Sequence, residues 1–212
     1  TLPRRAADYA GLPAARPPAP QPTGQRFARM AWYATVYALA TAAARRHFPH
    51  GEHHRELHPA VEAVRWLRSG WRKLRYAVGE RHRLTELTAP GTSRRWFLLP
   101  LQVHNDAQLA EHSPYDCVTE MLAQVVASFA EHAPADTRLV VKHHPMDRAY
   151  RDYTALVAEL RRTHGLGERL VYVHDLHLPT LLKHARGVVT VNSTTGLQAL
   201  LHGRPVCTLG EA

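Results

Sequence analysis

The segment from Leu139 to Pro145 places three potential anion-binding side chains directly after a short apolar run. The run Leu139 to Val141 has the composition of a strand buried in a parallel sheet. Lys142, His143 and His144 follow it, and each can donate a hydrogen bond or carry a positive charge. Because the carboxyl ends of strands in open α/β sheets border the ligand crevice, the segment predicts an anion site.

A second candidate is the polar turn 192–196, Asn-Ser-Thr-Thr-Gly, which follows the apolar run 187–191 and leads into a predicted helix. Hydroxyl groups and backbone N–H groups at the positive end of a helix dipole can hold a phosphate. Serine and threonine are also the usual helix N-cap residues, and for the turn alone capping is the simpler explanation. Because the turn lies one or two βαβ steps from 139–145, we expect both clusters at one crevice.

Strand and helix patterns alternate around these two clusters, as they do in Rossmann-like parallel α/β sheets with right-handed crossovers. Apolar runs predict the strands, and apolar residues spaced by three or four predict the helices between them. The predicted strands are 96–103, 139–142, 170–173, 187–191 and 206–209, and the predicted helices are 115–132, 150–164, 178–184 and 197–201.

We expect three parts in the chain. Residues 1–25 form a Pro-rich linker, 26–90 a helical connecting region, and 91–212 a Rossmann-like nucleotide-binding domain that is incomplete. The Ala-rich segment 27–48 predicts a buried or interfacial helix, because its roughly 15 apolar residues are fewer than the roughly 20 that cross a bilayer.

The segment 59–80 predicts an amphipathic helix, because its apolar residues recur every three or four positions. Pro59 stands near its first turn, where proline is favoured. The basic residues between the apolar ones are expected to form a solvated face. The apolar residues are Val61, Val64, Leu67, Trp71, Leu74 and Val78, and the basic ones are Arg65, Arg68, Arg72, Lys73 and Arg75.

Positive charge is concentrated in the first half of the chain. Residues 1–100 contain 17 Lys and Arg against 6 Asp and Glu, whereas residues 101–212 contain 10 against 12. A basic half of this kind can meet nucleic acid, an anionic membrane surface or a phosphorylated substrate, or can simply be solvated. Nucleic acid is the least favoured partner, because the aromatic residues are not interleaved with basic ones on a strand platform.

No metal or cofactor is predicted. The His-rich run 47–58 contains Pro49 and Gly51, which indicate a turn, and no carboxylate or thiolate partner at ligand spacing stands out. Cys117 and Cys207 lie far apart, which fits a reducing compartment better than a disulfide framework. With no signal peptide visible, the expected location is cytoplasmic, and peripheral attachment to the inner face of the inner membrane stays open.

Six motifs follow one another along the chain. They are Trp66-x-Arg68-Ser69-Gly70-Trp71-Arg72-Lys73, Leu99 to Val103 with Asp106 and Gln108, His112-Ser113, Lys142-x-His144-Pro145, Val191 to Gly196, and Gly203-x-Pro205-Val206. In order and spacing this series resembles the bacterial capsular polysaccharide biosynthesis and export proteins, β-Kdo glycosyltransferases that use CMP-Kdo to build the lipid-linked linker of group 2 type capsules. The resemblance covers roughly residues 50–212.

The resemblance implies a GT-B-like enzyme of two Rossmann-like halves, with this chain holding the nucleotide-binding half. Its substrates would be a CMP-sugar donor and a lipid-linked glycan acceptor. His144 and Pro145 would contact the donor phosphate, and an imidazole with a hydroxyl cradle would stabilise departing CMP without a metal. The other implied nucleotide-binding residues are Lys142, Asn192, Ser193, Thr194 and Thr195, and further candidates are Gln102, Asp106, Gln108, His112 and Ser113. For Asp106 we expect loop capping or ribose binding.

The catalytic residue that acts on the sugar is not identified, and we expect it in an amino-terminal half outside this chain. Residues 1–212 alone are then expected to be inactive, and the expected reaction of the whole enzyme is a retaining β-Kdo transfer. One alternative is another GT-B-like nucleotide-sugar enzyme, such as a UDP-sugar transferase or epimerase. The other is a non-catalytic capsule export or assembly component whose basic half docks on anionic lipid or polysaccharide. Capsule assembly and export proteins are the expected protein partners.

Overall fold

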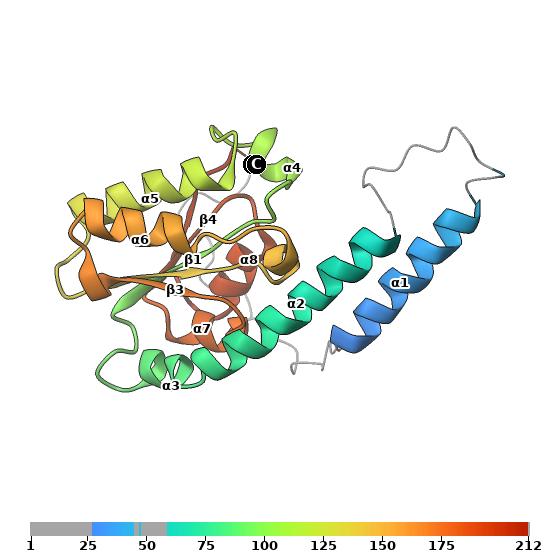
Figure 1. Ribbon diagram of the computed structural model, residues 1–212. Coiled ribbons are helices and arrows are strands. Elements are labelled where there is room, and N and C mark those ends of the chain that lie inside the picture. Colours follow the sequence, from blue (N-terminus) through green and yellow to red (C-terminus); the bar gives the residue numbers. More distant parts are fainter. Residues whose placement is uncertain (1–26, 45–46, 48–58, 212) are drawn as a thin grey trace, which may run out of the picture.

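The computed structural model describes residues 27–44, 47 and 59–211, and Figure 1 shows its chain path. The predicted Pro-rich linker at 1–25 lies outside the described residues, as does the His-rich run 47–58 apart from His47. Within the described part, a pair of long helices comes first, and the rest of the chain forms a sheet with further helices on both of its faces (Figure 1).

A five-stranded sheet forms the centre of the protein, with strand order β3-β2-β1-β4-β5 and every neighbouring pair parallel. This confirms the predicted α/β class with a Rossmann-like parallel sheet. The predicted strands 96–103 and 187–191 run past the observed ends, and 170–173 matches. The strands are β1 (Trp96–Pro100), β2 (Arg138–Lys142), β3 (Leu170–Val173), β4 (Gly187–Thr190) and β5 (Val206–Thr208).

Helices cover both faces of this sheet (Figure 1). The longer α5 and α6 lie on one face, and α3, α7 and α8 pack against the other. The helices that follow the initial pair are α3 (Arg83–Thr88), α4 (Ala107–Ala110), α5 (Val118–His132), α6 (Thr154–Thr163), α7 (Leu178–His184) and α8 (Thr194–Leu201), with short 3₁₀ helices η2 (Pro145–Ala149) and η3 (Gly167–Arg169).

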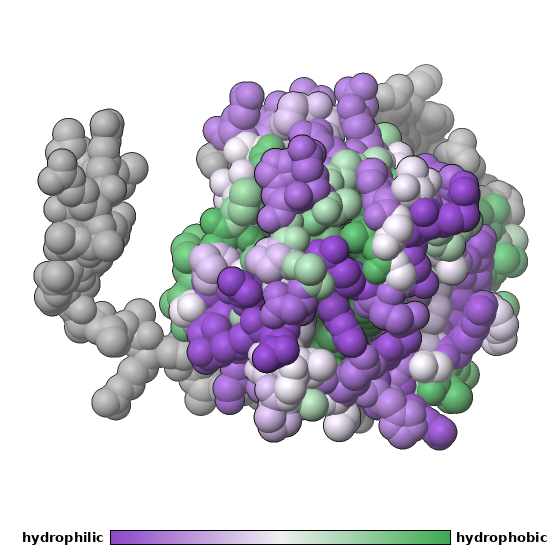
Figure 2. All heavy atoms as spheres, turned by 90° about the vertical axis from the view of Figure 1, so that its left-hand side faces the viewer, coloured by the Kyte–Doolittle hydropathy of each residue, from purple (hydrophilic) through white to green (hydrophobic). Residues whose placement is uncertain are grey.

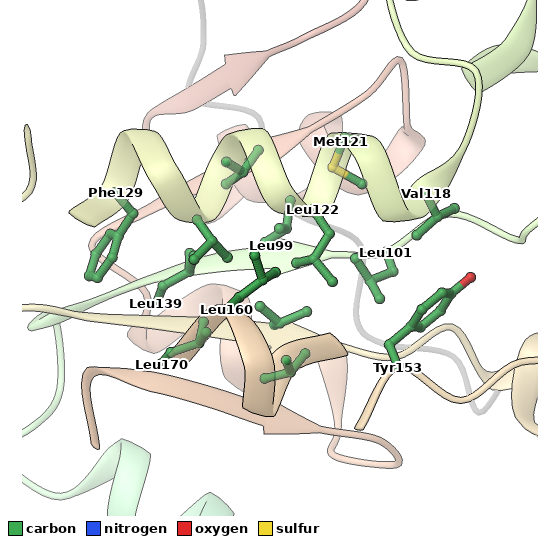
Figure 3. Packing of buried hydrophobic residues seen from close by; sticks show 14 of the residues in the cluster. Leu99, Leu101, Val118, Met121, Leu122, Phe129, Leu139, Tyr153, Leu160 and Leu170 are labelled. Carbon is green, nitrogen blue, oxygen red and sulfur yellow. The ribbon is translucent and has the colours of Figure 1, made fainter. Parts of the chain in front are cut away.

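Strand side chains alternate between the two faces and so divide the core into two hydrophobic clusters. Leu99, Leu139 and Leu170 lie in the cluster beneath α5 and α6, where they meet Leu122 and Leu160 (Figure 3). Burying one such leucine stabilises the fold by roughly 1.5–3 kcal/mol. The two clusters together hold the sheet between its helices. The cluster on the opposite face includes Leu98, Val140, Val171, Leu181 and Leu182.

The initial pair, α1 (Phe27–Ala44) and α2 (Pro59–Gly79), lies at one end of the sheet domain (Figure 1). Phe27 packs against Trp66 with 5.4 Å between their ring centroids. Gly70 also faces this ring, since a Cβ there would lie 3.4 Å from Phe27, at ordinary contact distance. Among the described residues, no helix is long and apolar enough to cross a membrane.

The face of α2 that meets the sheet domain is polar, and the prediction of a solvated basic face is wrong for Arg72. This side chain is only 8% exposed. Its guanidinium donates to the backbone carbonyls of Arg148 at 2.8 Å and Arg151 at 3.1 Å, and to the Asp152 carboxylate at 3.0 Å. Arginine can be buried here because its planar fork of donors finds three acceptors on the loop after β2.

The apolar face of α2 points to solvent as a consequence. Its six predicted apolar residues are between 44% and 75% exposed, so the amphipathic pattern is real but is turned away from the core. The helix is therefore attached through its polar side. The exposed residues are Val61, Val64, Leu67, Trp71, Leu74 and Val78.

A buried imidazole pair lies where the end of α2 meets β3. The Glu80 carboxylate accepts the backbone N–H of His174 and lies 2.5 Å from Nδ1 of the His174 ring. That ring stacks on Tyr76 with 3.6 Å between the two ring centroids. Behind it, His143 lies 5.3 Å away and bonds the Tyr172 hydroxyl through Nδ1 at 2.7 Å. Burial, followed by the nearby His174 and Lys142, lowers the pKa of His143 to about 3.

The buried His143 predicts a loss of stability in acid. The unfolded chain binds this proton near the ordinary histidine pKa of about 6.5, whereas the folded protein binds it only near a pKa of about 3. Because the folded pKa is the lower one, the free energy of unfolding should fall as the pH drops from about 6.5 toward 3, by up to about 1.4 kcal/mol per pH unit. Urea unfolding at several pH values measures this slope.

The variant His143→Gln should show a flatter dependence on pH over that range. The matched control is His132→Gln, since the His132 side chain is 68% exposed at the end of α5. It should keep the slope of the parent protein. Equal slopes for His143→Gln and the parent would contradict the assignment of the acid sensitivity to this ring.

Candidate functional site

Loops from three neighbouring strands emerge at the carboxyl edge of the sheet. Because β1 lies between β2 and β4, the segments that follow Pro100, Lys142 and Thr190 leave the sheet side by side. From β1 the chain adds β2 and β3 on one side and then β4 and β5 on the other. In open α/β sheets this change of direction marks the usual ligand crevice, which here lies between β1 and β4.

At the end of β4 the predicted polar turn forms the amino terminus of α8. Ser193 is the N-cap, and its Oγ accepts the Thr195 N–H at 3.2 Å. The helix begins at Thr194, three residues before the predicted start, because this cap satisfies an N–H of the first turn. The capping explanation is confirmed. Thr194 is nevertheless exposed at the positive end of the helix dipole, which also suits an anion.

Asn192 connects this turn to the loop after α4. Its φ of 40° lies in the left-handed region, which asparagine adopts more readily than most residues, and its Nδ2 donates to the His112 carbonyl at 2.8 Å. The Ser113 hydroxyl donates back to α4, to the Leu109 carbonyl at 2.5 Å. A Cβ on Gly210 would lie 2.3 Å from the Asn192 amide, so any larger residue there would displace that side chain. His112 thus joins the turn through its backbone.

The loop after β1 is held by two of the predicted candidates. Gln102 is buried, and its Nε2 donates to the Val191 carbonyl, which ties the ends of β1 and β4 together. Asp106 is the N-cap of α4, where its carboxylate accepts the Gln108 N–H at 3.0 Å. The expected capping role of Asp106 is confirmed. A ligand contact by the Gln108 side chain stays a prediction.

Lys142, at the end of β2, turns into the protein. It is 5% exposed, and its Nζ donates to the carbonyls of His143 at 3.2 Å and His174 at 3.1 Å. Burial lowers its pKa to about 8, while the nearby Asp175 acts in the opposite direction. Its amine therefore stabilises the loop ends of β2 and β3, and the predicted contact with a bound anion stays a prediction.

One ring nitrogen of His144, Nδ1, accepts a hydrogen bond within the protein, and the other, Nε2, is left for a ligand. His144 caps η2, where its Nδ1 accepts the Met146 N–H at 3.2 Å, and Pro145 is exposed as the first residue of that helix. Burial lowers the pKa of His144, with Asp147 acting in the opposite direction, so the ring is neutral near pH 7. A neutral ring that accepts at Nδ1 carries its proton on Nε2. His144 is thus a ready N–H donor.

A buried carboxylate joins the loops after β1 and β2, and it was not among the predicted site residues. Asp147 is fully buried. Its Oδ2 accepts the backbone N–H of His104 at 2.8 Å, and its Oδ1 lies 2.6 Å from Nδ1 of the His104 ring. The His104 ring also stacks on Tyr150 with 5.5 Å between centroids. Asp147 stands two residues after Pro145, so its position in the motif was the one available sequence signal.

A cavity of about 480 Å³ lies between α1, α2 and η2. Pro145 and Met146 line it from the β2 side, and Phe27 and Trp66 line it from the helical pair. The ion pair between Arg148 and Asp175 also borders it. The cavity therefore adjoins the His144 segment, while the described residues of the Ser193 turn do not line it.

The part of the chain that the structure describes holds no group of three or more His, Cys, Asp or Glu side chains arranged to bind a metal ion. The donors at the carboxyl edge are instead N–H groups, hydroxyls and an imidazole. Such groups bind phosphate and carboxylate oxygens.

Comparison with known proteins places the chain in a family. The family model described as capsule polysaccharide biosynthesis protein matches residues 1–212. The chain is 45% identical over 168 residues to the capsule polysaccharide export protein KpsS of Escherichia coli. This match covers 79% of this chain and 43% of that protein. It is 39% identical over 195 residues to the capsule polysaccharide modification protein LipB of Neisseria meningitidis serogroup A, over 92% of this chain and 46% of that protein.

The chain spans a little less than half the length of these curated relatives. Among solved structures it is similar to Thermosulfurimonas dismutans KpsC, a beta Kdo 2,7 transferase, with a TM-score of 0.42 and 22% identity over 72% of this chain and 47% of that one. The family model that matches residues 1–212 and the identity to KpsS and LipB show that the chain belongs to the capsule polysaccharide biosynthesis protein family.

Proposed function

We propose that this chain supplies the donor-nucleotide site of an enzyme that transfers Kdo from CMP-Kdo to a lipid-linked glycan acceptor. Its family membership supports a role in capsule polysaccharide biosynthesis. The observation that carries the proposal is that the His144 segment and the Ser193 turn follow β2 and β4, the two strands on either side of β1, at the same carboxyl edge of the sheet. Nucleotides bind at this edge in sheets of the same order.

The chemistry of the proposed transfer asks for stabilisation of a leaving phosphate. The bond between the anomeric carbon of the sugar and a phosphate oxygen breaks, and negative charge grows on departing CMP. His144 would donate its Nε2–H to that phosphate, and the first turn of α8 would add its hydroxyls and its dipole. Both groups are already oriented by their own hydrogen bonds, to Met146 and Thr195, so little ordering is needed on binding.

Asp147 would position the loops after β1 and β2, which border the proposed phosphate site. Its carboxylate fixes His104 in the loop after β1, while its own backbone belongs to η2, directly after His144. The buried carboxylate acts on the ligand only through these segments. A change at Asp147 should therefore weaken nucleotide binding without removing any proposed ligand contact.

The names of the relatives favour a second candidate, a non-catalytic component of capsule export or assembly, because KpsS is described as an export protein. A nucleotide-sugar enzyme with another donor, such as a UDP-sugar, is the remaining alternative. Binding measurements separate these possibilities. Selective binding of CMP supports the transferase, equal binding of CMP and UMP supports the other donor class, and no nucleotide binding supports the export component.

The variant His144→Ala should weaken CMP binding by about tenfold or more, because a hydrogen bond to a charged group contributes roughly 1.5–3 kcal/mol. Isothermal titration calorimetry on the purified chain measures this change. His132→Ala is the matched control, since the ring is exposed at the far end of α5 from the site. Unchanged CMP affinity in His144→Ala would exclude the proposed phosphate contact.

The variant Ser193→Gly should also weaken CMP binding by about tenfold or more, because the Ser193 hydroxyl would donate to the same charged phosphate and such a hydrogen bond contributes roughly 1.5–3 kcal/mol. Glycine is chosen because it replaces a serine N-cap at a cost of only a few tenths of a kcal/mol, so α8 should stay folded. Circular dichroism checks the helix and calorimetry the affinity. A parent-like affinity would show that Ser193 acts as a helix cap alone.

The variant Asp147→Asn should lower the free energy of unfolding by about 2 kcal/mol, since its amide nitrogen would face a buried donor of His104. CMP binding should weaken at the same time. Asp136→Asn is the control, because Asp136 is exposed in the turn before β2 and should change stability by less than about 0.5 kcal/mol. Parent-like stability and affinity in Asp147→Asn would contradict the positioning role.

A further inference from the structure

The exposed apolar residues of α2 form one continuous surface, the α2 stripe, made of Val61, Val64, Leu67, Trp71, Leu74 and Val78. Their spacing of three and four places them on one side of the helix. From first to last the stripe is about 26 Å long, at 1.5 Å per residue. Contiguous apolar surface of this extent marks an interaction site in proteins.

The opposite side of α2 is committed to the sheet domain, so the stripe cannot simply turn inward. Arg72 donates to the Arg148 carbonyl in η2 and to a carbonyl and a carboxylate of the loop that follows η2, and Ser69 accepts from Arg148. Rotation of the helix would break these buried polar contacts, each of which is costly to leave unpaired.

Positive charge flanks the stripe. Arg68 and Arg75 are exposed next to it, and the Arg75 guanidinium lies 5.7 Å from the centroid of the Trp71 ring. No ion pair among the described residues engages either arginine. The one acidic residue of α2, Glu62, is buried on the other side. The exposed face is thus apolar with a basic edge and carries no negative charge.

We propose that the α2 stripe docks on an anionic membrane surface, with α2 lying in the plane of the interface. An apolar face with a tryptophan and a basic flank is the arrangement that binds anionic lipid, since the side chains enter the acyl boundary while the arginines meet the headgroups. α1, which packs beside α2, adds the exposed aromatic residues Trp32 and Tyr33. Aromatic rings of this kind favour the membrane interface.

Charge is what favours a lipid surface over a second protein. An apolar protein interface would remove water from Arg68 and Arg75 without supplying an opposite charge. Anionic headgroups would neutralise both arginines. The half of the chain that contains α2 is basic as well, with 17 Lys and Arg against 6 Asp and Glu in residues 1–100. The side of the molecule away from the helical pair is mostly hydrophilic, so the apolar surface is not a general feature (Figure 2). This proposal does not depend on the proposed donor nucleotide.

Co-sedimentation with vesicles of phosphatidylcholine containing 30% phosphatidylglycerol tests the proposal, with pure phosphatidylcholine vesicles as the neutral comparison. The chain should bind the anionic vesicles and bind the neutral ones at least tenfold more weakly. The double variant Leu67→Ala with Leu74→Ala should reduce binding at least tenfold. Arg68→Ala and Arg75→Ala should each reduce it by about fivefold, and added salt should weaken binding of the parent more than of these variants.

Two matched controls keep the outcome specific to the stripe. Leu197→Ala with Leu200→Ala removes two leucines of α8 that are 65% and 58% exposed, against 75% and 70% for Leu67 and Leu74. Arg162→Ala with Lys183→Ala removes two exposed basic residues of α6 and α7. Both pairs should bind vesicles as the parent does. Thermal unfolding followed by circular dichroism should show that every variant is folded.

Two results would overturn the proposal. The first is equal binding to neutral and anionic vesicles, or none to either. The second is a concentration-dependent dimer, seen by light scattering after size exclusion, that the Leu67 and Leu74 changes dissociate while vesicle binding is unaffected. That second result would assign the stripe to another copy of the chain.

Discussion

The burial of Arg72 determines how the amino-terminal helices meet the rest of the protein. Its guanidinium occupies three acceptors on the loop after β2, and a buried guanidinium without acceptors would cost several kcal/mol. This one side chain therefore fixes which side of α2 is turned inward. The cavity beside η2 and the exposed α2 stripe both follow from that orientation. A helix attached through its apolar face would have neither.

Most of the fold was predictable because its signals are local. β3 and α7 have the predicted bounds, since apolar runs between turn residues leave little choice of structure. Helix starts were less certain, and α8 begins at Thr194 because the Ser193 cap, not the first apolar residue, sets the first turn. The orientation of α2 was not predictable from its own pattern. A periodic stripe shows that a helix has two sides, whereas the partners of Arg72 lie 76 to 80 residues further along the chain.

In the candidate site too, local contacts were predictable from the sequence and long-range contacts were not. Capping by Ser193 and Asp106 could be anticipated, because each bonds an N–H two residues away. The pairing of Asp147 with His104 spans 43 residues, and that of Glu80 with His174 spans 94, so neither leaves a local trace. Long-range ties of this kind decide whether a polar residue faces a ligand or another part of the chain. Lys142 illustrates the point, since its amine ends on two backbone carbonyls.

Arg72 also makes α2 and the loop after β2 a single mechanical unit. Its bonds end on the carbonyls of Arg148 and Arg151, in the same short segment that begins with His144. Whatever shifts α2 must therefore shift this segment or break those bonds. The buried guanidinium thus ties the position of the helical pair to that of the segment at the edge of the sheet.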